Sequence, residues 1–185
     1  MCFSSYRRVL FTLLALAFSL NPAWSFAKQG NFTIIWERIE GITPVPSFNG
    51  QIIEGILPVS FPWTLEHGRA QVNLANGKFE IFLSGLAIGA MPTPLSPLGT
   101  TGVVTAVRGT LVCAGEGAIF DTDAVDLTET GDAFVRGRLA DGVTACTPER
   151  MVFLLRVAAV LPGAPDITGH WLAYGASRRI QGGKP

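Results

Sequence analysis

The densest group of chemically active side chains is a run of carboxylates in the second half of the chain. Asp121, Asp123, Asp126 and Glu129 fall within nine residues. Oxygen-rich loops of this kind hold hard cations such as Ca²⁺. The spacing is not that of an EF-hand, because Asp126 stands where that loop needs glycine. The run therefore predicts a weak calcium site at Asp121, Asp123 and Asp126, with a solvated loop as the alternative.

Familiar catalytic signatures are missing from the sequence. It has no G-x-S-x-G elbow, no H-E-x-x-H motif, no P-loop and no dinucleotide fingerprint. Its two histidines are expected in a solvated turn, at His67, and in a structural position beside Trp171, at His170. We assign no catalytic residue, and no cofactor besides the weak calcium candidate. A glycosidase-type carboxylate pair stays open, since sequence does not give the separation of two carboxylates.

Aromatic side chains are the other chemical resource. Trp36, Trp63, Trp171 and Tyr174 are candidates for a platform that stacks on sugars or contacts a protein, although core packing is the commoner use of such residues. Phe61-Pro62-Trp63 lies in a proline-bounded segment, which favours exposure. Trp63 is therefore the weak candidate for ligand binding.

Composition limits the classes of protein to which the chain can belong. It has 185 residues, of which 48% are hydrophobic and 15% charged, and a formal net charge of zero. This composition excludes intrinsic disorder and indicates one folded domain. The balanced charge lacks the basic field that binding to nucleic acid requires.

The N-terminus has the pattern of a secretory signal peptide. Arg7 and Arg8 precede an apolar stretch over Val9–Leu20, and Ser25–Ala27 follows as a small-residue cleavage signal. The apolar stretch would be about 18 Å long as a helix, too short for a hydrocarbon core of about 30 Å. We therefore expect residues 1–27 to be removed during export, which leaves a mature chain without a transmembrane segment.

The mature chain, residues 28–185, keeps two cysteines. Loss of Arg7 and Arg8 reduces 14 basic groups to 12 against 14 acidic groups, a formal charge of −2. Cys113 and Cys146 are 33 residues apart and would reach an oxidising compartment. Two cysteines do not complete a structural zinc site, and the spacing is not that of a redox pair. They are expected to form one disulfide with Cα atoms within about 7 Å of each other.

Turn-forming residues and alternating patterns indicate β structure throughout. Proline and glycine recur every few residues, which leaves little room for helices. Strands are expected over Val103–Cys113, Ala133–Leu139, Met151–Val160 and His170–Ala176, with Asp121–Thr130 as loop. Many short strands without long helices predict an all-β fold, an antiparallel β-sandwich of the jelly-roll or immunoglobulin-like kind, with a barrel as the alternative.

The clearest local unit is a hairpin over Ala70–Leu83. Asn76-Gly77 is the residue pair that a two-residue type I′ turn prefers. With this pair at the tip, Val72 would lie opposite Ile81, and both would face the core.

Several short motifs allow a comparison with a known group of proteins. Val107–Cys113, then Gly131–Ala133, then Cys146 and finally Gly169–Ala173 resemble, in this order, motifs of small secreted bacterial proteins of unassigned function. The resemblance covers roughly residues 70–177. It implies an exported β-rich domain with a cysteine pair, and it implies no catalytic residue.

Taken together, these features predict a protein that is secreted, periplasmic or at the cell surface and that acts as a binding or structural module. The partner expected is an extracellular protein or a cell-envelope polymer. The alternative is a secreted hydrolase of the glycosidase kind. A concave site with converging polar groups would indicate an enzyme, whereas a flat or aromatic face would indicate a module. An open hydrophobic edge strand would indicate an oligomeric subunit.

Overall fold

The computed structural model describes residues 32–42, 52–89, 99–117, 119–139, 143 and 146–182. The expected signal peptide, residues 1–27, lies outside these ranges. The described part of the chain consists of β-strands, turns and one short 3-10 helix, so the all-β prediction is confirmed. None of its helices is of the length and apolar character needed to cross a membrane.

Eleven strands and the 3-10 helix follow one another along the chain. They are β1 (Phe32–Gly41), β2 (Trp63–Thr64), β3 (His67–Asn73), β4 (Lys78–Ser84), β5 (Ala87–Ile88), β6 (Val104–Cys113), β7 (Ile119–Asp121), β8 (Val125–Asp126), β9 (Ala133–Arg138), η1 (Pro148–Arg150), β10 (Met151–Val160) and β11 (Trp171–Gly182).

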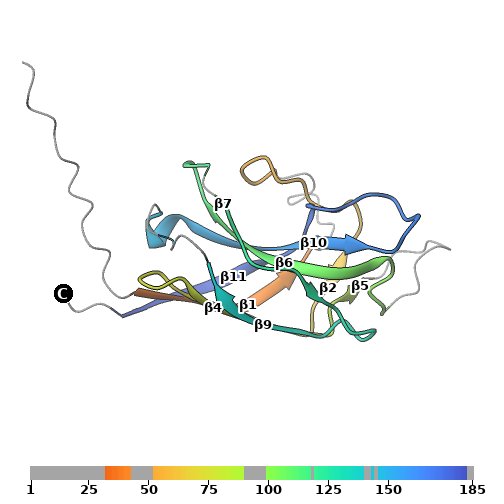
Figure 1. Ribbon diagram of the computed structural model, residues 1–185, viewed down its shortest axis with the longest axis horizontal. Coiled ribbons are helices and arrows are strands. Elements are labelled where there is room, and N and C mark those ends of the chain that lie inside the picture. The colour runs from red at the N-terminus through yellow and green to blue at the C-terminus, as the bar shows by residue number, and fades with distance from the viewer. Residues whose placement is uncertain are drawn as a thin grey trace, which may run out of the picture.

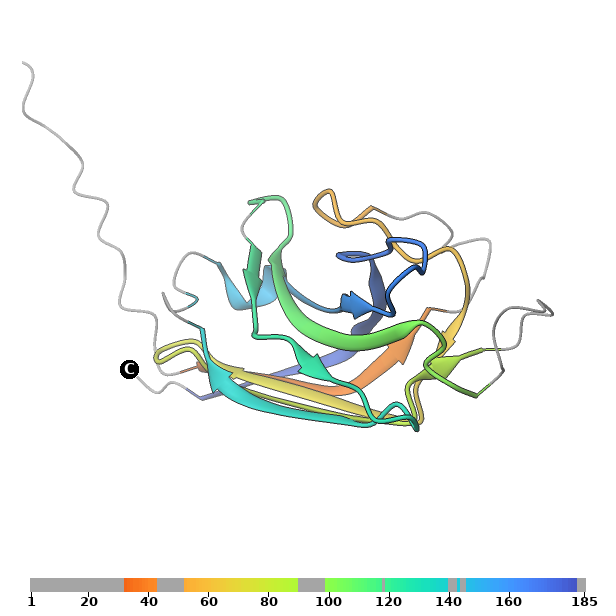
Figure 2. The same ribbon diagram turned by 45° about the vertical axis from the view of Figure 1, so that its right-hand side comes forward.

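Nine of these strands form one curled sheet, in which all strand pairs are antiparallel. The order is β7-β6-β10-β11-β1-β3-β4-β9, with β8 also paired to β6, while β2 and β5 form a small second sheet (Figure 1). In Figure 2 the green β6 and the blue β10 arch over the layer made by the orange β1, the yellow hairpin and the teal β9. The architecture is a half-barrel, which fits the sandwich and the barrel alternatives alike.

The core lies between the two halves of the curled sheet. Inward side chains of β1, β3 and β4 meet those of β6 and β10, and the Trp36 ring packs against Phe153 in a tilted arrangement with ring centroids 5.5 Å apart. A void of about 10 Å³ in this region is at the lower limit of what one water needs. Gly109 of β6 lets the halves approach, because a Cβ there would lie 2.3 Å from Ile81 Cδ1 of β4.

The hairpin forms between β3 and β4, but the expected register is wrong by two residues. The structure pairs Val72 with Phe79 and Ala70 with Ile81. A shift of two residues keeps every side chain on its expected face. The inward positions are therefore as predicted, whereas the cross-strand neighbours are not.

The cause of the shift is the side chain of Asn73. Its Oδ1 atom accepts hydrogen bonds from the backbone N–H groups of Ala75 and Asn76, at 3.1 and 3.2 Å. Gly77 has a φ of 68°, and its N–H donates to the Asn73 carbonyl oxygen. Asn76 has no positive φ, which a type I′ turn would require, so the turn is longer than two residues.

The other expected strands are present, with two corrections. β6, β9 and β10 lie close to their predicted ranges, and β11 continues to Gly182. The segment Asp121–Thr130, expected as loop, contains the end of β7 and all of β8. The strand pattern of β6 also suits a strand with Arg108 and Thr110 on a solvated side, but Thr110 is fully buried, and its hydroxyl donates to Asp121 Oδ1 of the neighbouring β7, at 2.6 Å.

Candidate functional site

The outward surface of β3, β4 and β9, called the outer face below, combines charged side chains with two exposed aromatic rings. Cross-strand pairing arranges its side chains in rows, because residues directly opposite each other share a face of the sheet. The rows are Arg69, Phe82 and Phe134; Gln71, Glu80 and Arg136; and Lys78 with Arg138.

Phe82 and Phe134 are the notable members of this surface. They lie directly opposite each other on β4 and β9 and are 49% and 53% exposed. The guanidinium of Arg136 lies over the Phe134 ring, 4.8 Å from its centroid. This cation–π contact orders an aromatic surface that solvent can reach.

Three hollows lie along β3 and β4 and share lining residues, and together they are called the groove below. The first, of about 640 Å³, shares Arg69 and Phe82 with the central hollow of about 270 Å³. The central hollow shares Gln71 and Glu80 with the third, of about 610 Å³. The groove thus follows β3 and β4 from His67 to the hairpin turn, about 20 Å at roughly 3.3 Å per residue.

The hairpin end of the groove is basic. Arg136 pairs with one carboxylate oxygen of Glu80, while the Gln71 side-chain amide donates to the other oxygen. Arg138 donates from Nε to the Asn76 carbonyl oxygen, at 2.7 Å, which leaves its two terminal nitrogens without a partner among the described residues. Among the described residues, the Lys78 ammonium likewise has no hydrogen-bond or ion-pair partner.

The other end of the groove is lined by paired charges. Glu40 pairs with Arg38 and accepts a hydrogen bond from the Tyr174 hydroxyl, at 3.1 Å. Glu37 pairs with Arg179 at 3.1 Å. Glu66 and Arg69 also line this end and form no ion pair among the described residues, so charges of both signs are present here.

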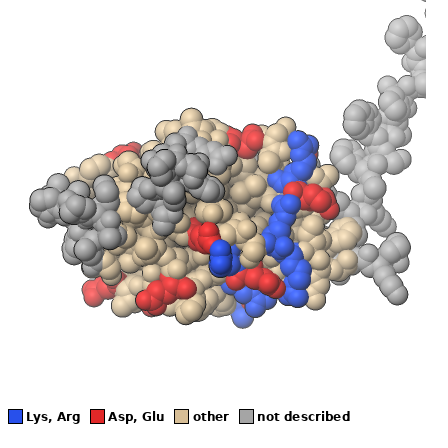
Figure 3. Space-filling view, turned by 180° about the vertical axis from the view of Figure 1, so that it is seen from behind, with Lys and Arg blue, Asp and Glu red and all other residues tan. Residues whose placement is uncertain are grey.

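Figure 3 shows how charge is distributed on one face of the molecule. Lys and Arg side chains gather in a column toward the end where β1 begins and β11 ends, and acidic side chains lie beside them. The rest of that face has few cations. On this face, positive charge is therefore concentrated at that end.

Trp63 does not have the exposure that its proline-bounded segment predicts. It is completely buried, and its ring packs against Phe61 with centroids 5.9 Å apart. Pairing of β2 with β5 turns the side chain into the core, where the indole nitrogen has no hydrogen-bond partner. The ring offers no face on which a ligand could stack.

The three aspartates of the calcium prediction do not converge. Asp121 accepts a hydrogen bond from Thr110 and pairs with Arg156 at 3.3 Å and Arg108 at 3.7 Å. Within the described ranges, the three carboxylates are not among the potential ligand groups whose atoms lie within 4.8 Å of one another. This geometry gives no support to the calcium site, which stays a prediction from sequence.

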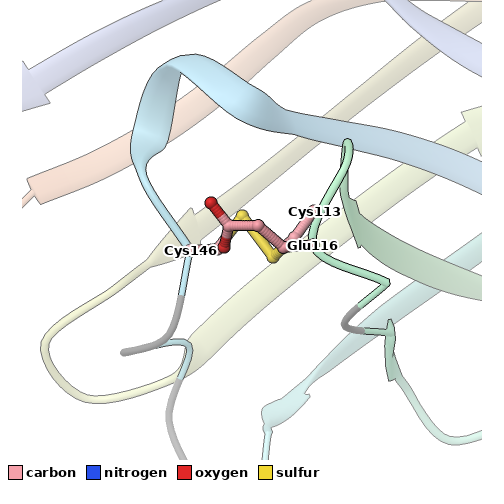
Figure 4. A group of neighbouring side chains, drawn as sticks. All are labelled: Cys113, Glu116 and Cys146. Carbon is pink, nitrogen blue, oxygen red and sulfur yellow. A yellow bond between two sulfur atoms is a disulfide. The ribbon is translucent and has the colours of Figure 1, made fainter.

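Cys113 and Cys146 form the predicted disulfide, with Cα atoms 5.6 Å apart. Figure 4 shows the Glu116 carboxylate beside the two sulfur atoms, and Arg150 pairs with that carboxylate at 3.0 Å. The three side chains have the proximity of metal ligands, but sulfurs joined in a disulfide are not the thiolates that bind metals. The group is therefore a structural link between β6 and the segment that leads into η1.

The two histidines occupy different surroundings. His67 is exposed at the start of β3 and lines the paired-charge end of the groove, whereas a solvated turn was expected. His170 is half-buried, and its Nδ1 lies 2.9 Å from the Ile167 carbonyl oxygen. The expected structural role of His170 agrees with this contact.

Comparison with protein-family models, with curated proteins and with solved structures gives no match for this chain. The resemblance to small secreted bacterial proteins thus stays a prediction from sequence.

The outer face itself was not predicted as a site. One signal was present in the sequence, because Phe134 alternates with Ala133 and Val135 and so falls on the same face as Arg136 and Arg138. An aromatic ring on the polar side of a strand is a reason to expect contact with a partner. The second ring, Phe82, joins it only through the pairing of β4 with β9.

Proposed function

We propose that this protein is exported and acts as a binding module that contacts a cell-envelope polymer or an extracellular protein through its outer face. The observation that supports this most strongly is the pair of exposed rings, Phe82 and Phe134, on an otherwise charged sheet surface. The leader pattern and the Cys113–Cys146 disulfide support export, since disulfides persist in oxidising compartments.

The energetics of the two rings favour a binding role. Complete burial of a Phe side chain contributes about 1.5–3 kcal/mol, so covering the exposed halves of both rings would contribute roughly the same amount in total. That corresponds to about a tenfold gain in affinity or more. Arg136 stacks on one ring and presents an ordered surface, which lowers the entropic cost of binding.

The form of the groove also favours a module over an enzyme. It is an open surface along the strands. Of its acidic residues, Glu37, Glu40 and Glu80 are each paired with an arginine, and Glu66 is the one carboxylate of its described lining without an ion pair. A hydrolase of the glycosidase kind needs two carboxylates that flank one sugar bond. The hydrolase stays the alternative from sequence, without a specific feature of the groove in its favour.

The proposal is tested by cosedimentation of the mature chain with cell envelopes isolated from the cells that make it. The variant Phe82→Ser/Phe134→Ser should bind at least about tenfold more weakly than the wild type. Leu161→Ser is the matched control, because Leu161 is 48% exposed and does not line the groove. Equal cosedimentation of the wild type and the double Phe variant, or none by the wild type, would contradict the proposal.

A further inference from the structure

We propose that the ligand of the groove is a linear polysaccharide whose sugars carry anionic groups, held at the basic end by Lys78 and Arg138. This inference rests on the proposed function and specifies its partner. It follows from the charge of the groove, its length and its position on the sheet.

The hairpin end of the groove carries an excess of positive charge. The hollow there is lined by three cations, Lys78, Arg136 and Arg138, against one carboxylate, Glu80. Glu80 neutralises Arg136, so two positive charges are left without compensation. The mature chain as a whole has a formal charge of −2, so the local positive charge is opposite in sign to the overall charge. Uncompensated charge of one sign attracts a ligand of the opposite sign.

The available donors match an anionic group. The two terminal nitrogens of Arg138 present the fork that binds a carboxylate, sulfate or phosphate through two parallel hydrogen bonds. Lys78 lies directly opposite Arg138 on β4 and adds a second cation to the same hollow. Both side chains are exposed, so an anion reaches them without displacing protein.

The shape of the groove selects a chain-like ligand. It continues from the basic hollow, past the two Phe rings, to the paired charges of Glu37 and Glu40, over about 20 Å. Phe82 and Phe134 lie in its middle, where apolar faces of sugar rings can pack on them. A small anion would fill only one end, whereas an extended polymer contacts the cations and the aromatic rings together.

The position of the groove favours a polysaccharide over a peptide. An extended peptide gains affinity mainly by adding a strand to the edge of a sheet, through main-chain hydrogen bonds. The hollows are lined by outward side chains of β3, β4 and β9, so a ligand there contacts the face of the sheet, and β4 in their centre is paired on both sides, to β3 and to β9. A polysaccharide has no such requirement, because it binds through side-chain donors and ring faces.

The experiment measures binding of the mature chain by calorimetry. The probes are oligogalacturonate, which carries carboxylates, a sulfated dextran oligomer, and a neutral maltooligosaccharide of matched length. A polyglutamate peptide represents the protein alternative. We expect at least one anionic oligosaccharide to bind at least about tenfold more tightly than the neutral one, and added salt to weaken that binding.

Substitutions test whether Lys78 and Arg138 hold the anionic group. Lys78→Gln/Arg138→Gln should lower the affinity for the anionic oligosaccharide at least about tenfold and reduce its salt dependence. Arg150→Gln removes an exposed arginine outside the groove and should leave affinity unchanged. Lys78→Arg/Arg138→Lys keeps both charges and should retain most of the binding. Melting temperatures of all variants identify any loss of folding.

Each possible result supports or overturns the proposed ligand. Tight binding of the carboxylated or the sulfated oligomer alone supports the proposal and identifies the anionic group. Equal binding of neutral and anionic oligomers, preferential binding of polyglutamate, or no effect of Lys78→Gln/Arg138→Gln overturns it. If none of the oligosaccharides binds but cosedimentation with envelopes still depends on Phe82 and Phe134, the inference fails and the proposed function stands.

Discussion

The closest test of the half-barrel is a substitution where its two halves meet. Gly109 of β6 faces Ile81 of β4 across the core. Along the sheet the two strands are far apart, because β10, β11, β1 and β3 lie between them. A Cβ at position 109 would lie 2.3 Å from Ile81 Cδ1 and 3.0 Å from Phe153 Cε2. Gly109→Ala should therefore destabilise the fold by about 1–3 kcal/mol through overpacking.

A second substitution makes this prediction specific. Ile81→Val removes the Cδ1 atom that the new Cβ would meet, and alone it should cost about 0.5–1.5 kcal/mol. In the double variant the alanine Cβ occupies the space left by Cδ1. The double variant should therefore lose at least about 0.5 kcal/mol less than the sum of the single losses.

Urea denaturation of the mature chain measures the free energies of unfolding of the two single variants and the double variant. An unchanged slope of this free energy against urea concentration indicates that all of them unfold in the same way. Gly131→Ala combined with Ile81→Val is the control. Gly131 has a φ of 79° and meets the Leu86 backbone, so its cost should add to that of Ile81→Val. A neutral Gly109→Ala, or additive losses in the Gly109–Ile81 pair, would refute the close approach of β6 and β4.

Three further predictions concern single interactions. Cys113→Ala/Cys146→Ala, which opens a link across 33 residues, should lower the free energy of unfolding in urea by roughly 3–4 kcal/mol, and an unchanged midpoint would contradict this. Hydrogen bonds from the Thr130 hydroxyl and the Gly85 N–H hold the pKa of Asp132 below its ordinary value of 3.8. The stability that this difference in pKa contributes is fully present above pH 3.8. It is lost as the pH falls through the lower pKa that Asp132 has in the folded state. Melting curves of Asp132→Asn should thus depend less on pH below about pH 4 than those of the wild type, and parallel curves would exclude the contribution. Asn73→Ala removes the acceptor for two backbone N–H groups of the hairpin turn and should cost about 1 kcal/mol in urea, whereas a cost near zero would show that the turn forms without it.

Local patterns were enough to predict the all-β class, the disulfide and the inward faces of the hairpin. The alternation around Val72 and Phe79 depends only on neighbouring residues, and a two-residue shift in register does not alter it. The register itself depended on the Asn73 side chain, which competes with the expected Asn76-Gly77 turn by binding the backbone.

Features that depend on distant segments were missed. β1 escaped prediction because Ile34, Ile35 and Trp36 are consecutive and all buried, so the strand shows no alternation. A register irregularity near Arg38 further disturbs its pattern. Trp63 has a sequence context typical of exposure, yet pairing of β2 with β5 buries it.

The candidate site was missed for the same physical reason. Its groove exists only when β3, β4 and β9 lie side by side, which brings Phe134 beside Phe82 and Arg138 beside Lys78. The sequence separation of these pairs exceeds that of any local motif. Composition gave no hint either, since an overall balance of charge conceals an excess of two cations at one end of the sheet.

The central claim is that the outer face is the binding surface, and chemical-shift mapping tests it most directly. Backbone amide spectra of the ¹⁵N-labelled mature chain would be recorded during titration with the anionic oligosaccharide that binds best. We expect the largest shifts at Arg69, Lys78, Phe82, Phe134 and Arg138. Shifts confined to other strands, or none at concentrations where calorimetry detects binding, would contradict it.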